Sequence, residues 1–110
     1  MSTFIQIVAT CPTRELADQI ARALVELRLA ACAQVTGPIA STYHWQGAVE
    51  SAEDFVLVAK SRSELFDEAA AEIARLHPYD TPEIIAVPIT SGSAKYLEWI
   101  AAETRQPGGS

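Results

Sequence analysis

The fold is indicated most clearly by residues 39–59, IASTYHWQGAVESAEDFVLVA, in which two extended runs flank the turn pair Gln46-Gly47. The first run places its bulky side chains, Tyr43 and Trp45, two residues apart, and the second ends in the apolar segment 55–59. Both patterns are typical of β-strands, so the stretch predicts a long antiparallel hairpin. Since this hairpin is too long for the sheet of one subunit, we expect part of it to pack on another copy of the chain.

Upstream of the hairpin, the sequence predicts a strand, a helix and the start of the next strand. Residues 4–9 are rich in β-branched side chains and are followed by Thr10-Cys11-Pro12-Thr13, as in a short buried strand. Apolar residues at spacings of four and three then indicate a helix, and they are Leu16, Ile20, Leu24 and Leu27. An extended pattern follows over residues 31–36 and is interrupted at Gly37-Pro38.

Downstream of the hairpin, the sequence predicts a second helix, an edge strand and a short last helix. Ser61 and Glu64 match the S-x-x-E capping box. The apolar stripe of the second helix follows at Leu65, Phe66, Ala69, Ile73 and Leu76. Residues 81–89 predict a strand whose prolines lie near its ends, which suits a sheet edge. Ser91 or Ser93 can cap the last helix, whose buried side we expect at Tyr96, Leu97 and Ile100.

The order of these elements predicts the fold class. Strand, helix, strand, strand, helix, strand is the order of the ferredoxin-like α+β fold, in which both crossover helices cover one face of a four-stranded antiparallel sheet. We expect one domain over residues 1–105, with an added C-terminal helix, and a flexible tail at residues 106–110. The other face of the sheet would stay bare, which again indicates an oligomer.

Composition limits the classes of partner. The chain has 110 residues and a mass of 11.9 kDa, with 49% hydrophobic and 20% charged residues, which suits one globular domain. A net charge of -6 and a pI near 4.7 have the wrong sign for binding nucleic acid. The sequence contains neither the run of about 20 apolar residues that spans a membrane nor a signal peptide. We therefore expect a cytoplasmic protein whose two cysteines are reduced thiols.

Local signatures of common enzymes are absent from the sequence. It has no G-x-x-x-x-G-K-[ST], G-x-G-x-x-G or G-x-S-x-G segment, so a phosphate cradle or a hydrolase nucleophile has no local support. Acyl-phosphate hydrolysis on a ferredoxin-like fold uses an arginine with an asparagine, and this chain has no asparagine. A nucleophile made of Cys11 or Cys32 with His44 or His77 is an alternative that the spacing does not predict. We expect no enzymatic activity and no required cofactor.

The cysteine and histidine side chains are candidate ligands for soft metal ions. Thiolates suit copper(I) and zinc, yet the cysteines and histidines show no C-x-x-C, C-x-H or H-x-x-x-H spacing. Cys32 lies among small apolar residues, which is typical of a buried thiol as well as compatible with ligation. Cys11 lies in a strand-to-helix turn, so we expect it to be the more exposed thiol, as a plain turn residue or, alternatively, as the more reactive of the two. His77 ends a helix and can cap it or bind a metal, whereas His44 belongs to the polar face of its strand.

Charged side chains provide two further candidates. Lys60 ends an apolar strand next to the start of a helix, where it can bind an anion or pair with another subunit. Glu50, Glu53 and Asp54 cluster near the hairpin tip, where they can bind a hard cation or stay solvated.

Several motifs occur together between residues 4 and 101. The most specific are His77-Pro78-Tyr79-x-x-Pro82-Glu83-Ile84-Ile85 after a helix and Ser41-x-Tyr43-x-Trp45-x-Gly47-x-x-Glu50 in the hairpin. The others are Thr10-x-Pro12, Leu29-Ala30-Ala31-Cys32, Glu53, Lys60 and Tyr96-Leu97-x-Trp99-Ile100. In this combination the chain resembles the CutA divalent-cation tolerance proteins.

This resemblance implies a ferredoxin-like subunit in a tight homotrimer, with the long hairpins paired between subunits and the C-terminal helix near the interface. Cys32 matches the family's Leu-Ala-Ala-Cys position, to which copper binding is attributed, whereas Cys11 stands where the family has another small residue. We take Cys32 and His77 as candidate metal ligands. The residues expected around an intersubunit cleft are Tyr43, Trp45, Lys60, Tyr79 and Glu83.

Two functions follow from these residues and from the resemblance. The first is a non-enzymatic homotrimer in the response to divalent metal ions, binding copper through Cys32 or His77. The second is a small-ligand sensor or signalling trimer, similar to the nitrogen-regulatory signal proteins, whose cleft holds an anion or metabolite near Lys60.

Overall fold

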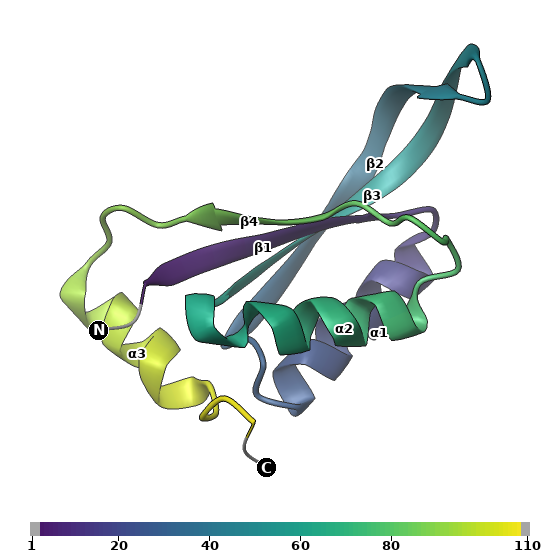
Figure 1. The fold of residues 1–110 in the computed structure, drawn as a ribbon. Helices are drawn as coiled ribbons and strands as arrows, with labels where there is room; N and C mark the ends of the chain where they lie inside the picture. The colour runs from purple at the N-terminus through teal and green to yellow at the C-terminus, as the bar shows by residue number, and fades with distance from the viewer. Residues whose placement is uncertain (1–2, 109–110) are drawn as a thin grey trace.

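Four antiparallel strands and three α-helices make up residues 3–108, which are the residues that the computed structural model describes (Figure 1). In the order β2-β3-β1-β4, the sheet contains β1 (Phe4–Cys11), β2 (Cys32–Trp45), β3 (Ala48–Arg62) and β4 (Ile84–Pro88). The helices are α1 (Arg14–Glu26), α2 (Phe66–Leu76) and α3 (Ala94–Glu103), with a short 3₁₀ helix (Ser63–Leu65) before α2. This arrangement confirms the predicted ferredoxin-like α+β fold with an added helix, and β4 lies at a sheet edge as its prolines predicted.

The hydrophobic core lies between the sheet and helices α1 and α2, which cover the same face (Figure 1). Burial alternates along β1, because successive side chains of a strand point to opposite faces. Fully buried members of the core include Ile7, Ile20, Leu24, Leu57, Leu65 and Ile73. Each large aliphatic side chain removed from water in this way contributes about 1.5–3 kcal/mol to stability.

The opposite face of the sheet, which we name the open face, carries half-buried side chains of β1 and β3. On β1 they belong to residues 6, 8 and 10, and on β3 to residues 56, 58 and 60. The edge strand β4 adds Ile85 and Val87, which are 48% and 39% exposed. An apolar surface of this kind on an outer strand agrees with the predicted bare face of the sheet.

Side-chain caps begin α1 and α3. The hydroxyl of Thr13 accepts the N–H of Leu16 at 3.1 Å, and the hydroxyl of Ser93 accepts the N–H of Tyr96 at 3.3 Å. Ser93 is therefore the cap among the two serines predicted for the last helix.

The predicted capping box at Ser61 and Glu64 is wrong. Strand β3 continues to Arg62 because its pairing with β1 extends to that residue, so Ser61 is still part of the sheet. The buried Ser61 hydroxyl donates instead to the carbonyl of Leu29 at 2.6 Å. Tertiary pairing thus overrides a local helix-start signal.

The hairpin of β2 and β3 rises from the sheet as a two-stranded ribbon, which we define as residues 39–54 (Figure 1). Its base is marked by a register shift between Thr36 and Ile39 around the cis Gly37-Pro38 bond. Tyr43 and Trp45 lie on the ribbon and are 43% and 60% exposed, whereas residues 55–59 return to the sheet. The projection accounts for a radius of gyration of 14.5 Å, above the roughly 13 Å expected for a compact chain of this length.

The chain after α3 lies against α2 as far as Gly108, whose N–H donates to Glu68 Oε2 at 2.8 Å. The flexible tail predicted at residues 106–110 therefore includes an ordered contact at Gly108. Its last two residues, 109 and 110, lie outside the described residues.

Candidate functional site

His77 lies between α2 and β4, where its side chain connects this segment to β1. Its Nδ1 accepts the N–H of Tyr79 at 3.2 Å, so Nε2 carries the proton and donates to the carbonyl of Thr10 at 2.9 Å. The imidazole is buried, and its ring centroid lies 4.9 Å from that of Tyr79. Both ring nitrogens are therefore used to position this segment, which we name the His77 loop (residues 77–83), and the side chain does not cap α2.

Cys32 lies at the start of β2 on the open face, within a row of polar side chains. The sheet register places Cys32, Lys60 and Gln6 opposite one another on three adjacent strands. The Lys60 ammonium donates to Gln34 Oε1 at 2.9 Å, and Gln34 follows Cys32 by two residues on the same face. We name these four residues, Gln6, Cys32, Gln34 and Lys60, the polar row.

Helix α3 adds a phenol to the polar row, because the Tyr96 hydroxyl lies 3.6 Å from Cys32 Sγ. The contact with Cys32 raises the pKa of Tyr96 above its ordinary value, and desolvation by burial adds to this effect. The phenol therefore keeps its proton at neutral pH and can donate it to the sulfur.

Cys11 is fully buried, so the expectation that it is the more exposed and reactive thiol is wrong. It is the last residue of β1 and points toward the helices with Ile5, Ile7 and Ala9. Desolvation by burial raises the pKa of Cys11 from 9.0 to about 11, and the Asp54 carboxylate contributes to this shift. At neutral pH it is a protonated thiol and a poor nucleophile.

This burial predicts a loss of stability in alkaline solution. Because folded Cys11 keeps a proton that the unfolded chain releases, its contribution is complete below about pH 9 and is lost as pH rises through about 11. The free energy of unfolding should fall by about 2–3 kcal/mol over this range. Urea unfolding at a series of pH values measures the effect, which Cys11→Ala should reduce. The pH dependence of the unsubstituted protein, retained in Cys11→Ala, would contradict the prediction.

The two candidate metal ligands lie in different parts of the sheet. Cys32 shares a row with Gln6 of β1, whereas His77 contacts the carbonyl of Thr10. Four residues of strand separate Gln6 and Thr10, which is about 13 Å. Residues 3–108 contain no group of three or more histidine, cysteine, aspartate or glutamate side chains that could hold a metal ion. Cys32 and His77 of one copy therefore do not form one metal site together.

The residues predicted to line an intersubunit cleft occupy three places in one subunit. Tyr43 and Trp45 are exposed on the ribbon, and Lys60 belongs to the polar row. Tyr79, which is 54% exposed, lies in the His77 loop, and Glu83 at the end of that loop accepts a β1 hydroxyl at 3.5 Å. The intersubunit cleft itself stays a prediction.

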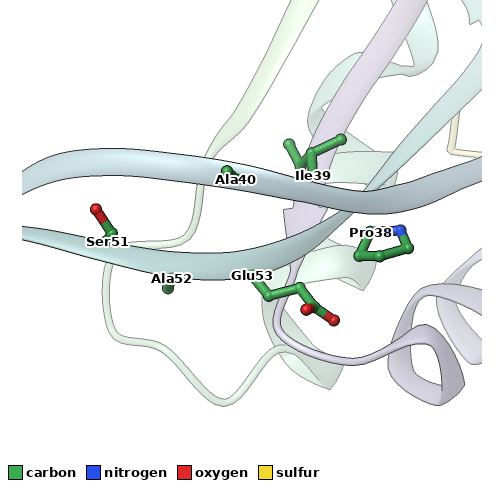
Figure 2. Close-up of a pocket in the computed structure, with 6 residues that line it drawn as sticks. All are labelled: Pro38, Ile39, Ala40, Ser51, Ala52 and Glu53. Atoms are coloured by element: carbon green, nitrogen blue, oxygen red, sulfur yellow. The ribbon is translucent and has the colours of Figure 1, made fainter.

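A hollow of about 460 Å³ opens beside the base of the ribbon (Figure 2). Its lining consists of Pro38, Ile39, Ala40, Ser51, Ala52 and Glu53. Glu53 is the single ionisable side chain among them, and Asp54, its neighbour on β3, points to the other face of the ribbon. The acidic residues singled out near the hairpin tip therefore do not converge on this hollow.

Sequence reasoning identified Cys32 and Lys60 separately but missed three of their neighbours. Gln34 and Gln6 belong to the polar row, and the two-residue spacing of Cys32 and Gln34 on one strand was a usable signal for the first. The contact of Tyr96 with Cys32 joins residues 64 positions apart, and no local pattern indicates it.

Comparisons with known proteins cover both candidate sites. A family model described as CutA1 divalent ion tolerance protein matches residues 5–103. The divalent-cation tolerance protein CutA of Archaeoglobus fulgidus is 43% identical over 100 residues, which are 91% of this chain and 95% of that protein. The chloroplastic protein CutA of Arabidopsis thaliana is 41% identical over 101 residues, which are 92% of this chain but 56% of that protein. The structure of a divalent cation tolerance protein (Cut A1) of Thermus thermophilus matches with a TM-score of 0.91 and 38% identity, covering 93% of this chain and 99% of that one.

Proposed function

Because this chain belongs to the CutA1 divalent ion tolerance family, we propose that it acts as a non-enzymatic homotrimer in the tolerance of divalent metal ions and binds copper through Cys32. The observation that carries the proposal is the family match over residues 5–103, which includes the polar row and the His77 loop. The names of the Archaeoglobus and Thermus relatives describe divalent-cation tolerance and not a catalysed reaction.

Cys32 is the better supported of the two candidate ligands. Cys32 is half-buried on the open face, whereas His77 would have to give up one of its two hydrogen bonds to reach a metal. A thiolate is also the donor that copper(I) prefers. One thiol does not make a closed site, so a threefold axis that brings one Cys32 from each copy together would complete it.

Unpaired edges and exposed apolar side chains support the homotrimer. Strands β2 and β4 form the two edges of the sheet, and each presents backbone groups that could pair with another strand. Tyr43, Trp45 and Ile85 are exposed on the ribbon and on β4. A closed ring of copies would cover both edges and this surface without leaving an open end.

Copper titration of the purified protein tests the proposed ligand. We expect Cys32→Ala to weaken binding of copper(I) at least roughly tenfold, about 1.4 kcal/mol, because the thiolate is the softest donor on the open face. Cys11→Ala is the matched control and should bind as the unsubstituted protein does, since its thiol is buried. His77→Ala should lower stability more than affinity. Unchanged binding in Cys32→Ala would remove the thiol from the proposal.

A small-ligand sensor remains the second candidate function, and the setting of Lys60 favours it. This cation lies on the open face, and its hydrogen-bond partner is the neutral Gln34 amide. None of the ion pairs within residues 3–108 includes Lys60. An anion bound between subunits would therefore pair with the Lys60 ammonium. Thermal stabilisation by organic anions but not by copper would favour this function over the first.

The cytoplasmic location also belongs to the proposal. Within residues 3–108, every helix is too short or too polar to cross a membrane. The Arabidopsis relative is named chloroplastic, and cell fractionation, with this chain expected in the cytoplasmic fraction, tests the proposed location.

A further inference from the structure

Helix α3 contacts Cys32 through Tyr96. Of the three residues expected on its buried side, Ile100 is buried and Leu97 is half-buried, whereas the expectation for Tyr96 is wrong. Its two large aromatic side chains, Tyr96 and Trp99, stack on one another at 5.7 Å and are 39% and 42% exposed. Besides the apolar anchor at Ile100, contacts outside the core therefore help to hold Tyr96 next to Cys32.

Those contacts come from a network of charged and polar groups that follows α3, which we name the C-terminal latch (Arg62, Glu68, Thr104, Arg105 and Gly108). The buried Arg62 donates from Nε to the hydroxyl of Thr104 at 2.8 Å and from Nη2 to the carbonyl of Arg105. Arg105 Nη2 donates to Glu68 Oε1 at 2.7 Å, and the other oxygen of Glu68 accepts the N–H of Gly108. Elements α2, β3 and the segment after α3 are thus joined through one carboxylate and two guanidinium groups.

The end of α3 has a further attachment at the end of α1. The N–H of Arg105 donates to the carbonyl of Arg28 at 2.9 Å, and Arg28 in turn pairs with Glu103 at 3.5 Å. This second pair is largely exposed and therefore contributes little to stability. Glu68 is a better residue than Glu103 to substitute, because its two carboxylate oxygens accept hydrogen bonds from two residues after α3, Arg105 and Gly108.

We propose that the C-terminal latch controls access to Cys32: with the latch closed, α3 holds Tyr96 over the thiol, and with it open, α3 moves away and exposes the sulfur. The contacts with Gly108 and Arg105 also hold the pKa of Glu68 below its ordinary value, which agrees with a carboxylate as the closing group. The reaction of Cys32 with a labelling reagent needs no copper, so this proposal and the proposed function can fail separately.

The test is the rate at which Cys32 in the full protein reacts with an aromatic disulfide reagent, with the labelled residue identified by mass spectrometry. Glu68→Gln removes the charge of the latch at almost constant volume, and we expect the rate to rise about tenfold. Glu72→Gln is the matched control, because it breaks the Glu72–Arg75 pair on the same helix without touching the latch, and the rate should not change. Hydrogen exchange of the α3 amides should increase in Glu68→Gln alone.

Three results would overturn the proposal. The first is a wild-type labelling rate in a folded Glu68→Gln variant. The second is an equal rise in Glu72→Gln, which would indicate general loosening of α2. The third is a rise that occurs only when sedimentation shows dissociation into single subunits, because the thiol would then be exposed by loss of a partner and not by movement of α3.

Discussion

Replacing Gly37 with alanine is expected to destabilise the protein by about 3 kcal/mol, because the backbone there has no room for a side chain. A Cβ atom would lie 2.5 Å from Phe55 Cδ2 and 3.1 Å from the carbonyl oxygen of Asp54, and the φ angle is +156°. Phe55 cannot move without cost, since the Arg14 guanidinium lies 5.0 Å over its ring and also donates to the Gly37 carbonyl. We therefore expect the base of the ribbon to lose its present geometry.

Urea unfolding at one fixed protein concentration measures this loss. Gly47→Ala is the matched control, because Gly47 also has a positive φ, +80°, but among residues 3–108, apart from Gly47 and its two chain neighbours, no atom lies within 4 Å of the position that a Cβ would take there. The control should cost about 1–2 kcal/mol from backbone strain alone. If Gly37→Ala costs no more than Gly47→Ala, crowding against Phe55 does not shape the hairpin base.

Replacing Ile85 with glutamate is expected to convert the proposed trimer into single, folded subunits. Ile85 lies on edge strand β4 and is 48% exposed in the subunit, so a carboxylate there remains hydrated when the subunit is alone. In the trimer it would be covered, and burying it would cost about 2 kcal/mol or more for each copy. Three such penalties act on one assembly and shift the equilibrium strongly toward single subunits.

Sedimentation velocity with far-ultraviolet circular dichroism tests the assembly and the fold together. Leu27→Glu serves as control, because Leu27 is similarly exposed, at 42%, but lies at the end of α1 in the helical layer. That variant should remain a trimer. A single-subunit species for the unsubstituted protein would refute the trimer, and a trimeric Ile85→Glu variant would show that the interface lies elsewhere.

The predicted order of elements was confirmed because each element has a short-range signature. Apolar residues at helical spacing marked α1 and α2, and the apolar strands on either side of the Gln46-Gly47 turn marked the hairpin. The prediction that Cys11 is exposed was wrong, because it was based on the turn that the neighbouring Pro12 indicates. The alternation of Ile5, Ile7 and Ala9 continues to Cys11 and would have predicted its burial.

For the candidate sites, the sequence identified residues but not their neighbours. His77 was recognised, yet its two hydrogen-bond partners, the Thr10 carbonyl and the Tyr79 N–H, follow from the packing of a loop against β1. The capping box at Ser61 failed for a related reason, because pairing with β1 kept that residue in a strand. Long-range pairing can outweigh a local preference of about 1 kcal/mol.

By itself, the sequence determined the order of the strands and helices and the family, because these depend on side-chain type and on spacings of a few residues. Only the tertiary structure decided that Tyr96 meets Cys32, that Lys60 and Gln6 share its row and that Glu68 joins α2 to the segment after α3. Such contacts depend on strand register and on how a helix docks. Both are set by the packing of the whole subunit, so no periodic pattern in the sequence predicts them.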